Sequence, residues 1–259
     1  MNMLTREWNM KLPKITKTLI ATLLAGSLQA CAAEPDYPPD FTEWNVGFAG
    51  SLLYPVMYSY DVYGVNEKED WTSLIHPQII IHGNPEKKLS RIRRLLGDQK
   101  YEGYELQLGE IVKNSQIAGT KTLPDQVYVR WTSIINENEY FTVLDVTKDM
   151  KTVMKTPRLH PRGLDYPCYQ TTFVFGFLPD GRAKVWLEGC RIFTYVGELE
   201  PKAKNLYQGE VERAPIMDIY EKQAGKSAYP IPWDKVNKVY YPKERFTMNT
   251  LEEALSEAK

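Results

Sequence analysis

Runs of alternating apolar and polar residues, separated by turn sequences, constrain the fold of this chain more than any other feature. In "LPDQVYVRWTSIINENEYFTVLDV", Val127, Val129 and Trp131 fall on one face of a strand, and Asn-Glu-Asn breaks the run, as in a hairpin. "WNVGFAG" and "YPVMYSYDVYGV" predict two earlier strands. We expect an α+β fold in which antiparallel strands dominate. The pattern leaves open a sandwich or a sheet with helices on one side.

A further hairpin is predicted around Pro-Asp-Gly at positions 179–181. A two-residue loop of Asp180 and Gly181 would place Phe175 opposite Trp186 and Val174 opposite Leu187. Both faces of this strand pair are then apolar, which is typical of strands buried on two sides.

Two or three short helices are expected beside the strands. The clearest is "NPEKKLSRIRRLLG", where Asn84 is a capping residue, Gly97 ends the helix, and the apolar residues form one stripe. A short helix is predicted at 148–155. A final helix begins at Thr250, with Glu253 completing a capping box.

The N-terminus has the order of a secretory signal peptide. Lys11, Lys14 and Lys17 precede an apolar run from Leu19 to Leu28, and small residues follow. The run is about half of the roughly twenty residues that a membrane-spanning helix needs. We therefore predict that residues 1–30 are removed, and a start at position 10 would give a more compact signal.

Cys31 is predicted to carry a lipid. "Leu28-Gln29-Ala30-Cys31" resembles the bacterial lipobox, in which the cysteine becomes the acylated N-terminus. Ala32 follows, rather than the aspartate that marks inner-membrane retention, so the resemblance implies the periplasmic face of the outer membrane. The alternative is an ordinary cleaved signal with Cys31 near the cut. We expect residues 31–42 to be a proline-stiffened tether and residues 43–259 a single globular periplasmic domain.

Charge excludes one class of function. Removing residues 1–30 leaves 28 basic and 32 acidic residues of the 32 and 33 in the whole chain, a net charge of about −4. A nucleic-acid-binding protein normally has a dominant basic face. The only membrane contact that the sequence predicts is the N-terminal lipid.

Cys168 and Cys190 remain as an even pair in an oxidising compartment, which favours a disulfide. The two-residue loop places Cys190 opposite Thr171 and Cys168 on the other face. A direct bridge then requires a bulge or loop at the start of the strand, next to Pro167. Two separate buried thiols are the alternative.

Motifs that carry chemistry are missing. The sequence contains no Gly-x-Ser-x-Gly, and "GKS" at 225–227 lacks the earlier glycine of a phosphate-binding loop. Its three histidines have no metal-ligand spacing. The acidic run between Glu198 and Glu212 is interpreted as a solvated face. We therefore predict a protein that is not an enzyme and has no cofactor or metal.

Several fragments together resemble an uncharacterised family of Gram-negative lipoproteins. The matching positions are Leu123, Pro124, Trp131, Ser133, Glu139, Tyr140, Leu178 to Gly181, Val185 and Trp186. Such lipoproteins lie beside type VI secretion effectors, particularly phospholipases, and are taken to be immunity proteins. The resemblance therefore implies a lipoprotein that binds and inhibits a secreted effector. The alternative is a structural or assembly lipoprotein of the envelope that has no toxin partner.

Aromatic residues bracketed by prolines are the candidate partner contacts, because such loops are ordered in advance and tend to be exposed. We predict four contact residues on this basis: Tyr166, Tyr169, Tyr229 and Trp233. The alternative is that they pack beneath their own loops.

Overall fold

The computed structural model describes residues 37–66, 71–75, 85–117, 119–206, 218, 221, 222, 225 and 227–258. Residues 37–259 form one compact unit. The predicted signal peptide, Cys31, Asn84 and the histidines at 76 and 82 lie outside the described residues.

The predicted tether of residues 31–42 is too long at its C-terminal end. Phe41 is fully buried and stacks on Tyr37, with ring centroids 5.2 Å apart. The Tyr37 hydroxyl accepts a hydrogen bond of 2.7 Å from the backbone N–H of Leu123. Because this aromatic pair packs on the domain, residues 37–42 belong to the compact unit.

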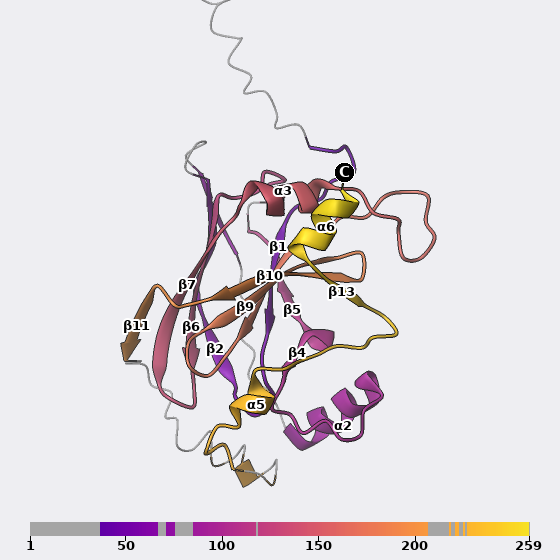
Figure 1. Cartoon of the computed structure of the whole chain (residues 1–259). Coiled ribbons are helices and arrows are strands. Elements are labelled where there is room, and N and C mark those ends of the chain that lie inside the picture. The colour runs from indigo at the N-terminus through magenta and orange to yellow at the C-terminus, as the bar shows by residue number, and fades with distance from the viewer. Residues whose placement is uncertain are drawn as a thin grey trace, which may run out of the picture. The chain divides into compact units, whose positions relative to one another are not determined.

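Two sheets form the body of the unit (Figure 1). The first has the order β13 (Thr247–Thr250), β10 (Ile192–Leu199), β9 (Ala183–Gly189), β8 (Thr172–Phe177), β1 (Asn45–Ala49), β5 (Val112–Asn114). The second has the order β11 (Ala203–Leu206), β7 (Asn138–Asp145), β6 (Gln126–Ser133), β2 (Val56–Asn66), β3 (Trp71–Leu74). A short pair joins β12 (Val239–Tyr240) to β4 (Leu106–Gln107).

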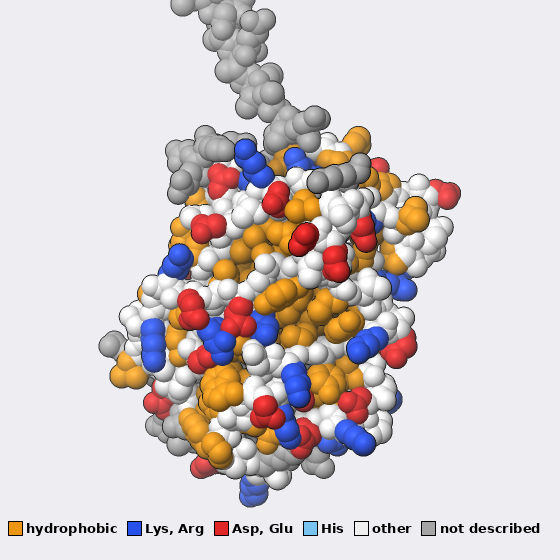
Figure 2. Space-filling view, in the orientation of Figure 1, with side chains coloured by type: hydrophobic (Ala, Val, Ile, Leu, Met, Phe, Trp, Pro, Cys, Tyr) orange, Lys and Arg blue, Asp and Glu red, His pale blue; other side chains and the backbone are white. Residues whose placement is uncertain are grey.

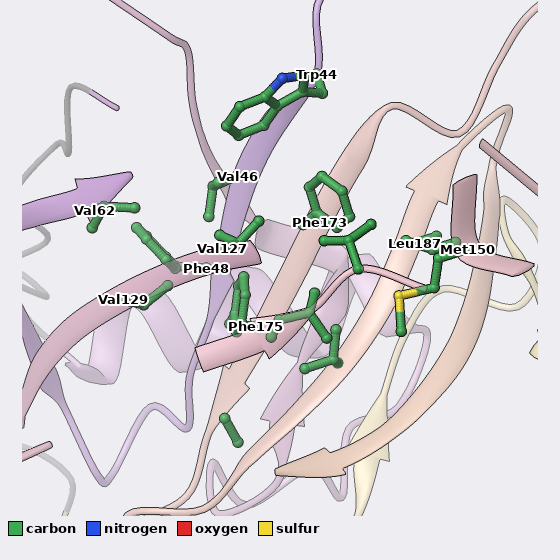
Figure 3. Close-up of a cluster of buried hydrophobic side chains, with 14 of the residues drawn as sticks. Trp44, Val46, Phe48, Val62, Val127, Val129, Met150, Phe173, Phe175 and Leu187 are labelled. Atoms are coloured by element: carbon green, nitrogen blue, oxygen red, sulfur yellow. The ribbon is translucent and has the colours of Figure 1, made fainter. Parts of the chain in front are cut away.

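The main core lies between these two sheets. Phe48, Phe173 and Phe175 come from the first sheet, while Val127 and Val129 come from the second, and all are buried in one cluster (Figure 3). The inward face of β6 alternates as predicted. The structure is thus an α+β fold dominated by antiparallel strands, and its two sheets form a sandwich.

Helices lie outside the two sheets. Their bounds are α2 (Pro85–Leu96), η1 (Leu108–Glu110), α3 (Lys148–Lys155), α5 (Trp233–Val236) and α6 (Leu251–Glu257). Helix α2 ends at Gly97 with φ +67°, and α6 has the predicted capping box between Thr250 and Glu253. Helix α3 is capped by the Thr147 side chain, which accepts a hydrogen bond from the Met150 N–H.

The predicted register of the β8–β9 hairpin is wrong by one residue. Val174 pairs with Trp186 and Phe175 with Val185. A two-residue loop would require Pro179 to donate a backbone hydrogen bond, which proline cannot do. Instead the Gly181 N–H bonds to the Leu178 carbonyl at 3.1 Å, and Gly181 has φ +105°. Proline therefore sits inside a three-residue loop that ends in a positive-φ glycine.

The outer face of the first sheet carries a second buried cluster. Val174, Trp186 and Phe193 project from the sheet, and Ala228 and Val236 cover them. The chain around α5 is therefore packed on this sheet, close to the β8–β9 turn. This packing positions the first of two candidate surfaces.

Candidate partner-binding surfaces

Tyr229 and Trp233 lie close together on the segment that leads into α5. Tyr229 is 48% exposed and Trp233 is 40% exposed. The Tyr229 hydroxyl donates a 2.8 Å hydrogen bond to the Ile135 carbonyl, in the turn between β6 and β7. Each ring is thus accessible to a partner while it is held on the domain.

Arg182 is the charged neighbour of the Trp233 ring. Its guanidinium carbon lies 5.8 Å from the centroid of the Trp233 ring. Its Nε is 2.7 Å from the Asp180 carboxylate, and its Nη1 forms an ion pair with Glu198. A planar guanidinium with two carboxylate partners and an aromatic ring has little rotamer freedom left to lose. We call Asp180, Arg182, Glu198, Tyr229 and Trp233 the Trp233 surface.

The β6–β7 and β8–β9 turns support this surface. The Asn136 amide donates to the Pro179 carbonyl at 2.5 Å and to the Tyr140 hydroxyl at 3.1 Å, and so connects the β6–β7 and β8–β9 turns. Figure 2 shows acidic and basic side chains gathered over the strands next to α5, beside hydrophobic ones. The surface therefore combines exposed aromatic rings, a fixed arginine and an acidic rim.

Buried hydrogen bonds hold the segment that carries Tyr229. The Tyr54 hydroxyl donates to the Ala228 carbonyl at 2.9 Å, and burial raises the pKa of Tyr54 well above its usual value. The phenol therefore stays protonated and continues to donate at neutral pH. Lys235 of α5 forms an ion pair with Glu102, and this hydrogen bond raises the lysine pKa.

Tyr166 belongs to a different surface, on the loop of residues 157–168. Leu159 is 95% exposed, Leu164 is 42% exposed and Tyr166 is 55% exposed. Three large apolar side chains within eight residues are thus exposed on one loop, a local concentration of apolar surface. We call this segment the 157–168 loop; it projects beside α6 in Figure 1.

The base of the 157–168 loop is tied to the domain. Arg158 and Cys168 exchange backbone hydrogen bonds of 2.9 and 3.0 Å. The Arg158 guanidinium forms an ion pair of 2.5 Å with Glu257 of α6. Cys168 forms a disulfide with Cys190, their Cα atoms 5.7 Å apart. Cys168 reaches Cys190 because it precedes β8 and lies outside the strand register that argued against a direct bridge.

The loop tip is also ordered. The Gly163 N–H bonds to the His160 carbonyl at 2.9 Å, the Arg162 N–H bonds to the His160 ring nitrogen Nδ1 at 3.2 Å, and Gly163 has φ +67°. The His160 and Tyr166 rings are 4.9 Å apart. The apolar side chains are therefore presented by a folded turn.

Tyr169 was wrongly predicted as an exposed contact. It is only 9% exposed, and its ring meets Phe41 edge to face at 5.4 Å. Tyr169 lies one residue after Cys168, in the segment that leads into β8, and its ring packs into the main core, as the alternative reading of these aromatic residues expected. The prediction also missed Leu159, Leu164 and Arg182. An exposed leucine has no distinguishing pattern, and Arg182 looks like an ordinary turn residue.

The two surfaces lie at opposite ends of β8. The 157–168 loop closes at Cys168, just before β8 begins, whereas Arg182 follows the turn at the far end of β8. Six strand residues span about 20 Å. Of the predicted contact residues, Tyr229 and Trp233 therefore belong to the surface at one end of β8, and Tyr166 belongs to the loop at the other end.

Other candidate sites are weaker. Among the described residues, no group of three or more histidine, cysteine or acidic side chains is placed to hold a metal ion. Within the same residues, no helix has both the length and the apolar character needed to span a membrane. One hollow is lined by residues at the end of α2 and around β12: Leu96, Asp98, Lys238, Val239, Tyr240, Tyr241, Lys243 and Glu244.

A known protein family covers most of the chain. The model of a family described as "Protein of unknown function (DUF2931)" matches residues 32–234. This range contains the 157–168 loop, the disulfide and the Trp233 surface. No curated protein and no solved structure matches the chain.

Proposed function

Since the chain belongs to the DUF2931 family, whose description assigns no function, we propose from its own residues that it is an immunity lipoprotein. In this proposal, Cys31 carries the lipid that anchors the chain at the periplasmic face of the outer membrane. The domain binds and inhibits a phospholipase delivered by type VI secretion.

The Trp233 surface is the observation that carries this proposal. Tryptophan, tyrosine and arginine are the residue types most enriched among those that dominate binding energy at protein interfaces. Here Arg182 is held by Asp180 and Glu198 and lies over the Trp233 ring, and exposed Tyr229 is four residues before Trp233 on the same segment. A partner would meet side chains whose rotamers are already fixed, which lowers the entropy cost of association.

Inhibition would work by occlusion. The exposed rings of Tyr229 and Trp233 would fill an apolar recess at the mouth of the effector's active site or on its membrane-docking surface. The acidic and basic residues around them would form the polar rim that such interfaces have. A lipid anchor would keep the inhibitor where an incoming phospholipase meets its substrate.

Survival under attack tests the function. Cells that lack the protein should be killed by sibling cells that deliver the cognate effector, and should survive when the wild-type protein is restored. The structural alternative predicts the opposite pattern: envelope defects without any attacker, and no change in survival on restoration. That second pattern would overturn the proposal.

Paired variants test the surface. We expect Trp233→Ala and Arg182→Ala each to weaken effector binding by about 30-fold or more, the effect of losing about 2 kcal/mol at a hot spot. The control is Leu206→Ala, because Leu206 on β11 is also an exposed hydrophobic residue, 69% exposed, but lies outside this surface. Equal binding by all three variants would contradict the assignment.

A further inference from the structure

The 157–168 loop exposes apolar side chains that take no part in the proposed partner binding at the Trp233 surface. It holds nearly all of the Leu159 side chain in water, together with much of Leu164 and Tyr166. The disulfide and the Arg158–Glu257 ion pair fix the base of the loop to the domain. The apolar side chains of the loop are therefore held in an exposed position. Keeping such a patch exposed costs about 25 cal/mol for each Å² that burial would remove from water.

The loop lies next to the point where the chain enters the domain. Phe41 stacks on Tyr37 and also contacts Tyr169, the residue after the disulfide cysteine Cys168. The Lys155 ammonium lies 5.5 Å from the centroid of the Tyr37 ring, two residues before the loop begins. Both ends of the loop therefore flank Tyr37.

Chain length limits how far this end of the domain can be from the anchor. Six residue steps separate Cys31 from Tyr37. At about 3.5 Å for each step, they reach at most about 20 Å. The loop extends five residues from the Arg158–Cys168 pair to Gly163, a reach of up to about 16 Å. A chain of this length between Cys31 and Tyr37 is short enough to keep an anchored membrane surface within reach of the end of the domain that carries the loop.

We infer that the 157–168 loop is a second membrane contact, which rests its leucines and Tyr166 in the phospholipid surface to which Cys31 is anchored. This inference rests on the lipid anchor of the proposed function. The composition of the loop fits an interface: leucines enter the acyl boundary, the tyrosine ring sits at headgroup level, and Arg162 at the tip faces phosphate groups.

The contact would also orient the domain. With the 157–168 loop on the membrane, the Trp233 surface lies about 20 Å away at the far end of β8 and faces the periplasm. A single point of attachment would leave the domain free to turn about it. Two contacts restrict that motion and keep the partner-binding surface accessible.

Photo-crosslinking from one position tests the inference. The acylated chain with p-benzoylphenylalanine in place of Leu164 is reconstituted in vesicles of phosphatidylethanolamine and phosphatidylglycerol, then irradiated. We expect phospholipid adducts at position 164 at least fivefold above those from the same residue placed at position 206. Equal adduct yields at the two positions, with Cys31 acylated, would overturn the inference.

A second variant and a second setting complete the test. Leu159→Asp in the labelled chain should reduce lipid adducts at position 164 at least threefold without lowering Tm, because Leu159 has almost no contact with the domain. In cells, an adduct with a protein and not with phospholipid would overturn the inference in favour of a protein partner. The mass of the N-terminal peptide reports whether Cys31 is acylated, so a failure of the anchor is distinguished from a failure of the loop.

Discussion

Gly189 is a residue at which two backbones approach closely. A Cβ atom at this position would lie 2.6 Å from the Cα of Gln170 and would also collide with the Tyr169 carbonyl oxygen. Backbone atoms beside the disulfide cannot move aside as a flexible side chain can. The absence of a side chain at 189 therefore lets the end of β9 lie against the start of β8.

We expect Gly189→Ala to lower the free energy of unfolding by about 3 kcal/mol, the upper part of the usual cost of overpacking. Denaturant titration measures the change. Gly50→Ala is the matched control, because its Cβ would meet only Val56 at 4.0 Å. A change below about 0.5 kcal/mol in Gly189→Ala would show that the strands can separate without cost.

Glu105 is a buried carboxylate whose Oε2 has no hydrogen-bond partner among the described residues. Burial raises its pKa above the usual value of 4.5. The folded state then holds this proton more tightly than the unfolded state does, so unfolding free energy falls as pH rises through 4.5 towards the raised folded pKa.

Glu105→Gln should remove this part of the pH dependence. We expect the variant to gain stability relative to wild type as the pH rises above 4.5, and to show no such gain in acid below the unfolded pKa. Thermal unfolding over this pH range measures the difference. A stability difference that stays constant with pH would mean that Glu105 ionises normally in the folded protein.

Residue-level predictions from the sequence succeeded where spacing determines the outcome. The Thr250–Glu253 capping box and the terminating Gly97 depend only on neighbours along the chain. Exposure of an aromatic residue depends on contacts between distant segments. Tyr166 and Tyr169 both lie next to Pro167 or Cys168, yet one is exposed and the other meets Phe41, about 130 residues earlier in the chain.

At the scale of elements, the disulfide joins the 157–168 loop to the β9–β10 turn. Cys190 and Arg191 form that two-residue turn, both with positive φ, 55° and 62°. Few residues other than glycine, asparagine and aspartate adopt this conformation readily. The disulfide to Cys168 therefore helps to hold this turn in its positive-φ conformation.

Replacing both cysteines, as Cys168→Ser with Cys190→Ser, should lower the free energy of unfolding by about 3 kcal/mol, as expected for a bridge that closes a loop of roughly this length. The corresponding fall in Tm is about 6–12 °C for a domain of this size. Wild-type protein with a reducing agent should show the same fall. Unchanged melting in both samples would show that the bridge contributes nothing to stability.

Element positions were more predictable than their pairing. The strands of the β6–β7 hairpin and helices α2, α3 and α6 follow from periodicity and caps within one segment. Three parallel pairings in the described part of the chain join segments that no local pattern connects: β1 with β8, β10 with β13, and β12 with β4. The predicted β8–β9 register was wrong because of one residue, Pro179. Its missing N–H rules out the two-residue loop and indicates the longer one.

At the scale of the whole molecule, the sandwich separates two surfaces. One end carries the chain entry at Tyr37, the disulfide and the 157–168 loop; the other carries the Trp233 surface. The strands of the first sheet form the spacer between them. Two aromatic residues of the Trp233 surface, Tyr229 and Trp233, were predicted from the sequence. Arg182, which contacts Trp233, Asp180 and Glu198, was not. Arg182 and Glu198 become neighbours only through the pairing of β9 with β10.

We propose that the Trp233 surface holds a secreted effector. Co-purification of the tagged, acylated protein from solubilised envelopes of cells under attack, with quantitative mass spectrometry, tests this assignment. Three forms are compared: wild type, Trp233→Ala with Arg182→Ala, and the Leu206→Ala control. We expect near-equimolar recovery of one secreted phospholipase with wild type and with the control, and at least a tenfold loss with the double variant. Recovery of envelope-assembly proteins alone, or equal effector recovery by all three forms, would contradict it.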